Sequence, residues 1–194
     1  MREPVHKAIR KVWRDGVFSD GARLIPEETP LALTYNGGTY AVMMGSPEDL
    51  GDFAVGFSLS EGIVQSTEEI ETLDIVELDD GIELRMWLRP DRAERIAERR
   101  RNIAGPTGCG LCGTDSLGQV RRDPPAPAHP VRLTSTAVLR AESSLKSAQM
   151  LQKLTGATHA AAWCNLEGEV QLLREDVGRH NALDKLIGAM IRAN

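Results

Sequence analysis

The feature that most constrains how this 194-residue chain can fold is a stretch from about residue 102 to 130, where apolar periodicity gives way to glycine and proline. Regular helices and strands do not run through such a stretch, because glycine frees the backbone and proline removes a hydrogen-bond donor. The stretch divides the patterned sequence into residues 1–101 and 131–194. Long loops in compact domains are mostly functional or disordered, so we expect a mobile functional segment here.

This segment contains two of the three cysteines, in the run Gly108-Cys109-Gly110-Leu111-Cys112-Gly113. The neighbouring glycines leave both sulfurs open to approach, whereas structural cysteines usually sit among bulky apolar residues. The pattern therefore favours reactive thiols at Cys109 and Cys112. Three arginines, residues 99–101, end a short helix predicted over 91–101. They could favour a thiolate and attract an anionic ligand, or merely complement the dipole of that helix.

Composition excludes several classes of protein. The net charge of -5 and the pI of about 5.4 give no global attraction for nucleic acid or for an anionic membrane. No run of about 18 apolar residues suggests a membrane span, and the basic start of the chain is not followed by the apolar segment of a secretory signal. An odd number of cysteines, two of them close together, suits a reducing compartment. We therefore expect a cytoplasmic protein.

The N-terminal part predicts two hairpins and a helix. Asn36-Gly37 is a turn signal between apolar runs at 31–35 and 39–44, and Asp80-Gly81 joins a strand near 73–78 to the alternating run 82–88. Between the hairpins, Ser46 is predicted to cap a helix with Pro47 at its first position and Asp49 completing a capping box. Apolar residues at helical spacing follow, and Gly62 can end this helix. The apolar positions of this predicted helix are Leu50, Phe53, Ala54 and Phe57.

The C-terminal part predicts helix, two strands and helix. A hydroxyl at Thr134 or Ser135 should cap the first helix, which ends near Gly156 and whose predicted apolar face is Val138, Ala141, Leu145 and Ala148. Strands at 158–164 and 170–174 follow, joined by the turn 165–168. The last helix, about 178–192, should bury Leu183, Leu186, Ile187 and Met190 and leave His180, Asn181, Asp184 and Lys185 for another surface.

A polar segment, residues 174–186, spans the end of the second strand and the start of the last helix. A helix N-terminus attracts phosphate or carboxylate through free N–H groups, and Arg179 and His180 would add charge or donors. The alternative is local: Asp176 caps the helix, Asp184 and Lys185 are solvated, and His180 pairs with Asp184 one turn on. These residues alone leave both interpretations open.

The two motifs taken together, Gly-Cys-Gly-Leu-Cys-Gly and then Arg-Glu-Asp-Val-Gly-Arg-His-Asn-Ala-Leu-Asp-Lys, closely resemble the FdhD family of formate dehydrogenase accessory sulfurtransferases. Segments 43–50, 56–62 and 155–162 are also similar to that family, and the resemblance runs from about Arg23 to the last residue. The long motif at the helix start is highly specific, whereas a Cys-x-x-Cys pair alone is weak evidence.

The resemblance implies a sulfur carrier. Such a protein accepts sulfane sulfur from a cysteine desulfurase as a cysteine persulfide and delivers it to the molybdenum bis-pterin guanine dinucleotide cofactor of formate dehydrogenase. By position in the motif, Cys109 would carry the persulfide and Cys112 would be an assisting or alternate thiol. We expect the helix start, Gly178, Arg179, His180 and Asn181, to border the cofactor site, because the guanine dinucleotide brings phosphates. No tightly held metal is expected, and a homodimer is possible on this reading.

The resemblance also implies a fold: a cytidine deaminase-like α/β sandwich preceded by a smaller α+β part. Members of the family normally continue beyond the helix that closes this chain, so we expect the C-terminal portion of the sandwich to be lacking here. The predicted organisation is an α+β part over 1–101, a mobile Cys-x-x-Cys loop over 102–130 and the start of the deaminase-like part over 131–194.

Other classes of function compete with this one. A non-catalytic chaperone that binds the cofactor and apo-formate dehydrogenase would not need Cys109. A structural zinc site could add two of Cys164, His129 and His159 to the cysteine pair, but no second Cys-x-x-Cys supplies the usual set. A zinc deaminase would need a His-x-Glu upstream and a proline where Gly108 stands. A thioredoxin-like protein would place its cysteines at a helix start that follows a strand.

Overall fold

The computed structural model describes residues 2–92 and 131–193. Its elements, in chain order, are β1 (Val5–Arg14), β2 (Val17–Pro26), β3 (Thr29–Tyr35), β4 (Gly38–Gly45), α1 (Leu50–Ser60), a 3₁₀ turn (Thr67–Glu69), β5 (Ile70–Leu78), β6 (Gly81–Leu88), α4 (Ser135–Ala148), α5 (Met150–Thr155), β7 (His159–Cys164), β8 (Val170–Asp176) and α6 (Arg179–Arg192). The predicted loop over 102–130, with Cys109 and Cys112, and the predicted helix beyond residue 92 lie outside the described residues.

A four-stranded sheet forms the N-terminal half of the core. Its strand order is β4-β3-β6-β5, with β3 and β6 parallel and the outer pairs antiparallel. The predicted turn at Asn36-Gly37 is confirmed, and both residues have the positive φ, 48° and 77°, that such a turn requires. Helix α1 covers one face of the sheet, where the core residues Leu31, Leu33, Tyr35, Leu50, Phe53, Phe57, Leu84 and Met86 pack together.

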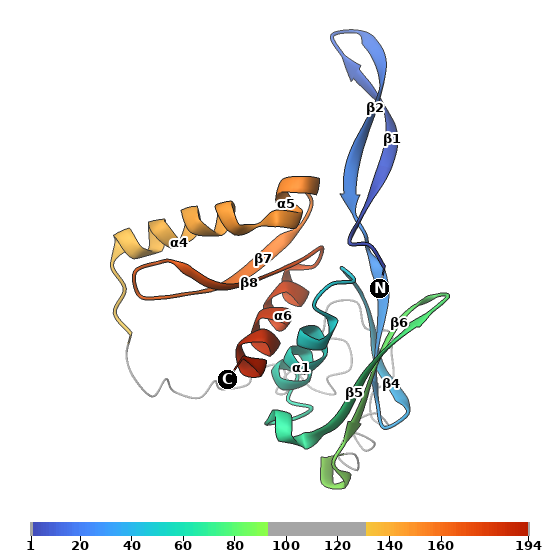
Figure 1. The fold of residues 1–194 in the computed structure, drawn as a ribbon, viewed down its shortest axis with the longest axis vertical. Helices are drawn as coiled ribbons and strands as arrows, with labels where there is room; N and C mark the ends of the chain where they lie inside the picture. The colour runs from blue at the N-terminus through green and yellow to red at the C-terminus, as the bar shows by residue number, and fades with distance from the viewer. Residues whose placement is uncertain (1, 93–130, 194) are drawn as a thin grey trace, which may run out of the picture.

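Helix α6 joins the two halves of the chain. It packs against α1 on one side and against the β7–β8 hairpin on the other, and α4 covers the opposite face of that hairpin (Figure 1). Helix α5 follows α4 and packs against β2. The predicted strands in this region are confirmed as the antiparallel pair β7–β8. The described residues thus form layers in the order α4, the β7–β8 hairpin, α6, α1 and the four-stranded sheet. This arrangement confirms the mixed α/β class. The predicted likeness to cytidine deaminase stays a prediction.

Two helix predictions in the C-terminal part need correction. The single helix expected to end at Gly156 is interrupted at Gln149, whose extended ψ of 98° separates α4 from α5. Thr134 does cap α4, because its side chain accepts from the Ala137 N–H at 3.1 Å. On the expected apolar face, Val138 is 55% exposed and Ala137 is buried instead. The reason is Gly168 in the β7–β8 turn, which packs against the Ala137 carbonyl so closely that a Cβ there would lie 2.1 Å from that oxygen.

The prediction that Ser46 caps α1 is wrong. The helix begins at Leu50, and its N-cap is Asp49, which has a left-handed φ of 53° and makes no side-chain capping bond. Ser46 is fully buried four residues earlier. Its backbone N–H donates to the carboxylate of Asp176, 130 residues away in the chain, at 2.9 Å. In the predicted capping box, this N–H would instead have donated to the side chain of Asp49.

Candidate functional site

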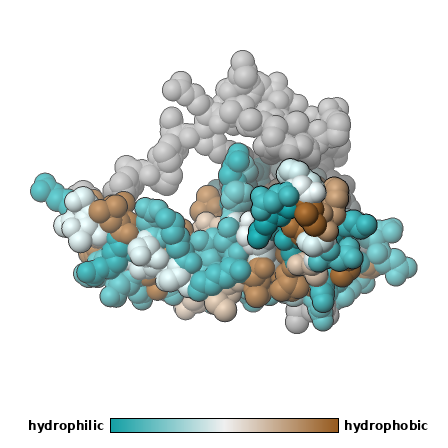
Figure 2. Space-filling model, turned by 90° about the horizontal axis from the view of Figure 1, so that it is seen from above, coloured by the Kyte–Doolittle hydropathy of each residue, from teal (hydrophilic) through white to brown (hydrophobic). Residues whose placement is uncertain are grey.

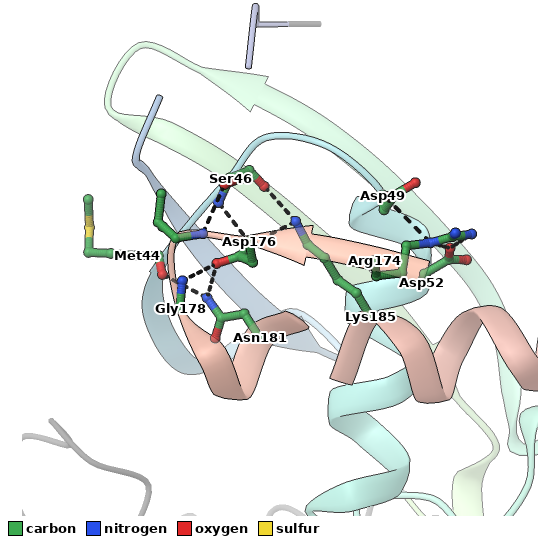
Figure 3. A network of polar contacts seen from close by, with 10 residues as sticks. Met44, Ser46, Asp49, Asp52, Arg174, Asp176, Gly178, Asn181 and Lys185 are labelled. Atoms are coloured by element: carbon green, nitrogen blue, oxygen red, sulfur yellow. Dashed lines mark hydrogen bonds and ion pairs between the residues drawn. The ribbon is translucent and has the colours of Figure 1, made fainter. Parts of the chain in front are cut away.

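The polar segment of the sequence folds into a corner between β8 and α6, and Asp176 is its centre. This carboxylate is completely buried and accepts four bonds (Figure 3). Its Oδ1 accepts from the Gly178 N–H at 2.7 Å and from the Asn181 side chain at 3.0 Å. Its Oδ2 accepts from the Ser46 N–H at 2.9 Å and from Lys185 at 2.7 Å. A buried carboxylate is tolerated only with such partners.

Lys185 is as buried as Asp176, with no exposed side-chain surface. Besides the ion pair, its ammonium donates to the backbone carbonyl of Ser46 at 3.0 Å. The prediction that Lys185 is solvated is therefore wrong. The reason lies in the spacing: residues 182, 185 and 189 share one helical face, and both alanines on it are buried. Lys185 must point into the same interior, and it needs Asp176 and Ser46 there.

The loop between β4 and α1 forms the other wall of this network. Asn181 donates to the Met44 carbonyl at 2.8 Å, and the Val177 N–H donates to the Ser46 hydroxyl at 3.2 Å. With the bonds to Asp176 and Lys185, these contacts join the β4–α1 loop to the β8–α6 corner. The buried residues of the long helix-start motif, from Asp176 to Lys185, thus hold the two halves of the chain together.

A second ionic cluster supports the same junction. Asp52 on α1 is buried, and it pairs with Arg174 on β8 at 2.7 Å and with Arg192 at the end of α6 at 2.6 Å. The carboxylate of Asp49 also lies 3.5 Å from Arg174. Arg174 thus links β8 to α1, and Arg192 links α6 to α1.

Arg179 and His180 are the exposed members of the predicted helix-start site. They occupy the first turn of α6, after the N-cap Gly178, and the first N–H groups of a helix have no acceptor within it. The Gly178 N–H and the Asn181 amide, in contrast, are already bonded to Asp176. The geometry therefore separates the motif into a buried part and an exposed part that could receive an anion.

The half-buried residue Asp184 on α6 has a carboxyl group whose pKa is raised. Asp184 accepts from the Ser60 hydroxyl at 2.7 Å. Burial raises its pKa to about 6, against the lowering effects of that bond and of nearby His180, while Glu61 raises it further. The local interpretation that placed His180 one turn from Asp184 is consistent with this electrostatic effect. A second raised pKa, that of Glu48 in the β4–α1 loop, results from partial burial and from repulsion by Asp49.

The remaining sequence candidates separate in space. Cys164 closes β7 and is half-buried, and His159 opens the same strand and is exposed. Cys109, Cys112 and His129 lie outside the described residues, so the structure relates none of them to the α6 start. Within residues 2–92 and 131–193, no helix has the length and apolar character of a membrane span.

Sequence reasoning considered Asp176 only as a cap and missed the roles of Ser46 and Lys185. The helical spacing of Lys185 with Ala182 and Ala189 was the one signal that could have placed it in the interior. Nothing local marks Ser46, because its partners come from β8 and α6.

Comparison with known proteins identifies the same family that the two sequence motifs resemble. Residues 26–194 match the model of the FdhD/NarQ family. The chain is 50% identical over 87% of its length to the sulfur carrier protein FdhD of Bordetella petrii, and 50% identical over 90% to that of Variovorax paradoxus. It spans 60% and 63% of the length of these two relatives.

A solved structure has the same fold. It is the crystal structure of a candidate formate dehydrogenase accessory protein from Desulfotalea psychrophila, with a TM-score of 0.67 and 22% sequence identity. The match covers 98% of this chain and 68% of that one.

Proposed function

Because this chain belongs to the FdhD/NarQ family, we propose that it is a sulfur carrier in the maturation of formate dehydrogenase. The observation that supports this most is the identity of about 50%, over about nine-tenths of the chain, to proteins named sulfur carrier protein FdhD. The cysteine pair in its glycine-rich run supplies the chemical group that such a role requires.

The proposed reaction passes one sulfur atom through Cys109. Its thiolate attacks the terminal sulfur of a persulfide on a cysteine desulfurase, the bond between the two donor sulfurs breaks, and the donor leaves as a thiolate. Cys109 then holds the persulfide. An acceptor attacks its terminal sulfur and releases the Cys109 thiolate again, with no net oxidation. Cys112 assists or serves as the alternate thiol.

The proposed acceptor is the molybdenum bis-pterin guanine dinucleotide, which is cargo for formate dehydrogenase. We place its phosphates at the start of α6, where Arg179 and His180 are exposed and the first N–H groups have no acceptor within the helix. Gly178 and Asn181 would shape this site through Asp176 rather than through their own donors. On this proposal the protein works in the cytoplasm, with desulfurase and dehydrogenase as its partners.

The decisive experiment is mass spectrometry after incubation with a cysteine desulfurase and cysteine. We expect one added sulfur on the peptide that contains Cys109, lost on reduction. Cys109→Ala should abolish loading at that peptide and activation of formate dehydrogenase, whereas Cys164→Ala is the matched control, because that thiol belongs to strand β7. Cys112→Ala tests the assisting role.

The chaperone alternative makes the opposite prediction for the same variants. If Cys109→Ala still activates apo-formate dehydrogenase to the level of Cys164→Ala, the carrier proposal fails and the protein acts by binding alone.

A further inference from the structure

The β1–β2 hairpin, residues 5–26, forms an arm that projects from the body of the molecule, with its turn at the far end (Figure 1). Ten residue pairs form its ladder. The main packing partner of β1 is β2, and near the base Arg23 donates to the Thr155 carbonyl of α5 at 2.6 Å. A free two-stranded ribbon is marginally stable at best in water, so this arm gains from a surface on which it can lie.

The two faces of the arm differ in character. Partners in the ladder share a face, and successive residues along a strand alternate between the faces. Trp13 and Phe18 pair directly, and Ile9 lies on the same face, four residues before Trp13. The side chains of Trp13, Phe18 and Ile9 are 64%, 69% and 77% exposed. The opposite face carries three arginines and one exposed valine, which are Arg10, Arg14, Arg23 and Val17.

Lysines alternate with the apolar residues on the aromatic face. Lys11 lies between Ile9 and Trp13, and Lys7 lies two residues before Ile9. Figure 2 views the molecule from the end at which the arm projects, and hydrophobic side chains appear there among hydrophilic ones. Protein interfaces are depleted in lysine, whereas at a membrane surface a lysine buries its stem and extends its ammonium group to the headgroups. The pattern therefore fits a lipid surface better than a protein surface.

The arm is also the basic part of an acidic protein. Residues 5–26 contain five lysines and arginines and two aspartates, a net charge of +3, whereas the whole chain has a net charge of -5. The remaining residues therefore have a net charge of -8. Composition gives the whole chain no attraction for an anionic membrane, but this asymmetry attracts the arm and repels the rest. Contact through the arm alone is favoured.

We propose that the arm lies on the surface of an anionic membrane, with Trp13, Phe18 and Ile9 in the interface between headgroups and acyl chains. Amphipathic elements with aromatic residues on one face and arginine or lysine on the other bind membranes in this way. The ribbon edges stay at the depth of the headgroups, where water completes the hydrogen bonds of the backbone. The lysines of the aromatic face reach the lipid phosphates. The protein binds this surface without spanning it.

Vesicle co-sedimentation of the full chain tests the proposal. Neutral phosphatidylcholine vesicles are compared with vesicles in which roughly a third of the lipid is phosphatidylserine. We expect a partition coefficient roughly tenfold or more higher on the anionic vesicles, and a decrease as salt rises. Trp13→Ser with Phe18→Ser should lower the coefficient by roughly tenfold or more. Trp87→Ser is the matched control, since Trp87 on β6 is 50% exposed and lies outside the arm. Circular dichroism checks the fold of each variant.

Two single charge changes should have opposite effects. Asp20 faces Lys11 across the ladder. Asp20→Asn removes a negative charge and should strengthen binding to the anionic vesicles by about fivefold, whereas Lys11→Gln should weaken it by a similar factor. Both changes leave the apolar residues in place, so an equal effect of the two would contradict an electrostatic contact with lipid.

The fluorescence of Trp13 distinguishes lipid from protein as the occupant of the arm. Trp87→Phe with Trp163→Phe leaves Trp13 as the only tryptophan of the chain. Without vesicles, acrylamide should quench its emission readily; anionic vesicles should shift the emission to shorter wavelength and protect it. Protection of Trp13 in the absence of lipid would mean that a protein surface covers the arm, and would overturn the proposal. So would equal binding to both kinds of vesicle, binding to neither, or binding that Trp13→Ser with Phe18→Ser leaves unchanged.

Discussion

Gly56 on α1 packs directly against the backbone of Asp184 on α6, so that a Cβ at Gly56 would lie 1.7 Å from the Asp184 carbonyl oxygen. Gly188 makes the reciprocal contact, and its Cβ would lie 1.9 Å from the carbonyl oxygen of Asp52. The two helices therefore approach through backbone rather than through side chains. This close contact joins the sheet of the N-terminal half to the layers of the C-terminal half.

Gly56→Ala should destabilise the protein by roughly 2–3 kcal/mol, because the methyl group forces α1 and α6 apart. Gly51→Ala is the comparison in the same helix: its added Cβ meets only the end of the long Arg192 side chain, which pairs with Asp52, so we expect a smaller loss than for Gly56→Ala. Urea denaturation followed by circular dichroism gives both values. Equal stability of the two variants would show that the helix contact is not rigid.

Removing one member of the buried ion pair should cost more than removing both charges. Lys185→Met leaves the Asp176 carboxylate buried without its cation, and we expect a loss of roughly 3–5 kcal/mol. Adding Asp176→Asn should recover part of this loss, because no buried charge remains and the amide oxygen still accepts on one side, while its NH2 group meets donors on the other. A double-mutant cycle from denaturation curves measures the coupling. Additive losses would mean that the pair does not act as one unit.

Asp184 should make the protein less stable as the pH rises. Its folded pKa of about 6 lies above the ordinary value of 3.8, so the native state binds the proton more tightly than the unfolded state does. The resulting stability is present below about pH 4 and is lost as the pH rises through 6. Asp184→Asn should therefore match the wild type near pH 4 and exceed it above pH 6, by roughly 1 kcal/mol after allowance for solvent screening.

Thermal unfolding at both pH values is the measurement for Asp184→Asn. Glu142→Gln is the control: the pKa of exposed Glu142 is lowered by Lys146, so its effect has the opposite sign. A stability difference for Asp184→Asn that does not change with pH would contradict the assignment.

Arg179→Ala should weaken binding of guanosine diphosphate without changing persulfide loading at Cys109, because Arg179 is exposed and takes no part in the buried network. Calorimetric titration measures the affinity. Arg140→Ala on α4 is the control for a general loss of positive charge. Unchanged affinity would return the start of α6 to a structural role.

The sequence predicted those elements whose signals are local. The turn at Asn36-Gly37, the hairpins and the capping hydroxyl of Thr134 are encoded within a few residues, and all of them formed as expected. Asp79 and Asp80 form the turn before β6, which begins at Gly81, within one residue of the predicted turn.

The failures have one physical cause, which is contact between residues far apart in the chain. Ser46 has the composition of a cap, yet Asp176 and Lys185 engage it from the other half of the protein. Leu183 was expected inside but is 49% exposed, whereas Asn181 and Lys185 are buried because their polar atoms have partners there. Periodicity counts apolar residues, and it cannot recognise a buried face made of glycine, alanine and a paired charge.

The contact between α1 and α6 sets an order for folding during synthesis. The sheet strands and α1 leave the ribosome before α6 has been translated, since α6 begins at Arg179. Until then the glycine side of α1 has no neighbour, and Ser46 lacks both Asp176 and Lys185. Contacts of such long sequence separation form slowly and late. The nascent chain therefore exposes the glycine side of α1 until α6 has been translated. A ribosome-stalled fragment that ends before residue 179 should be a substrate for chaperones.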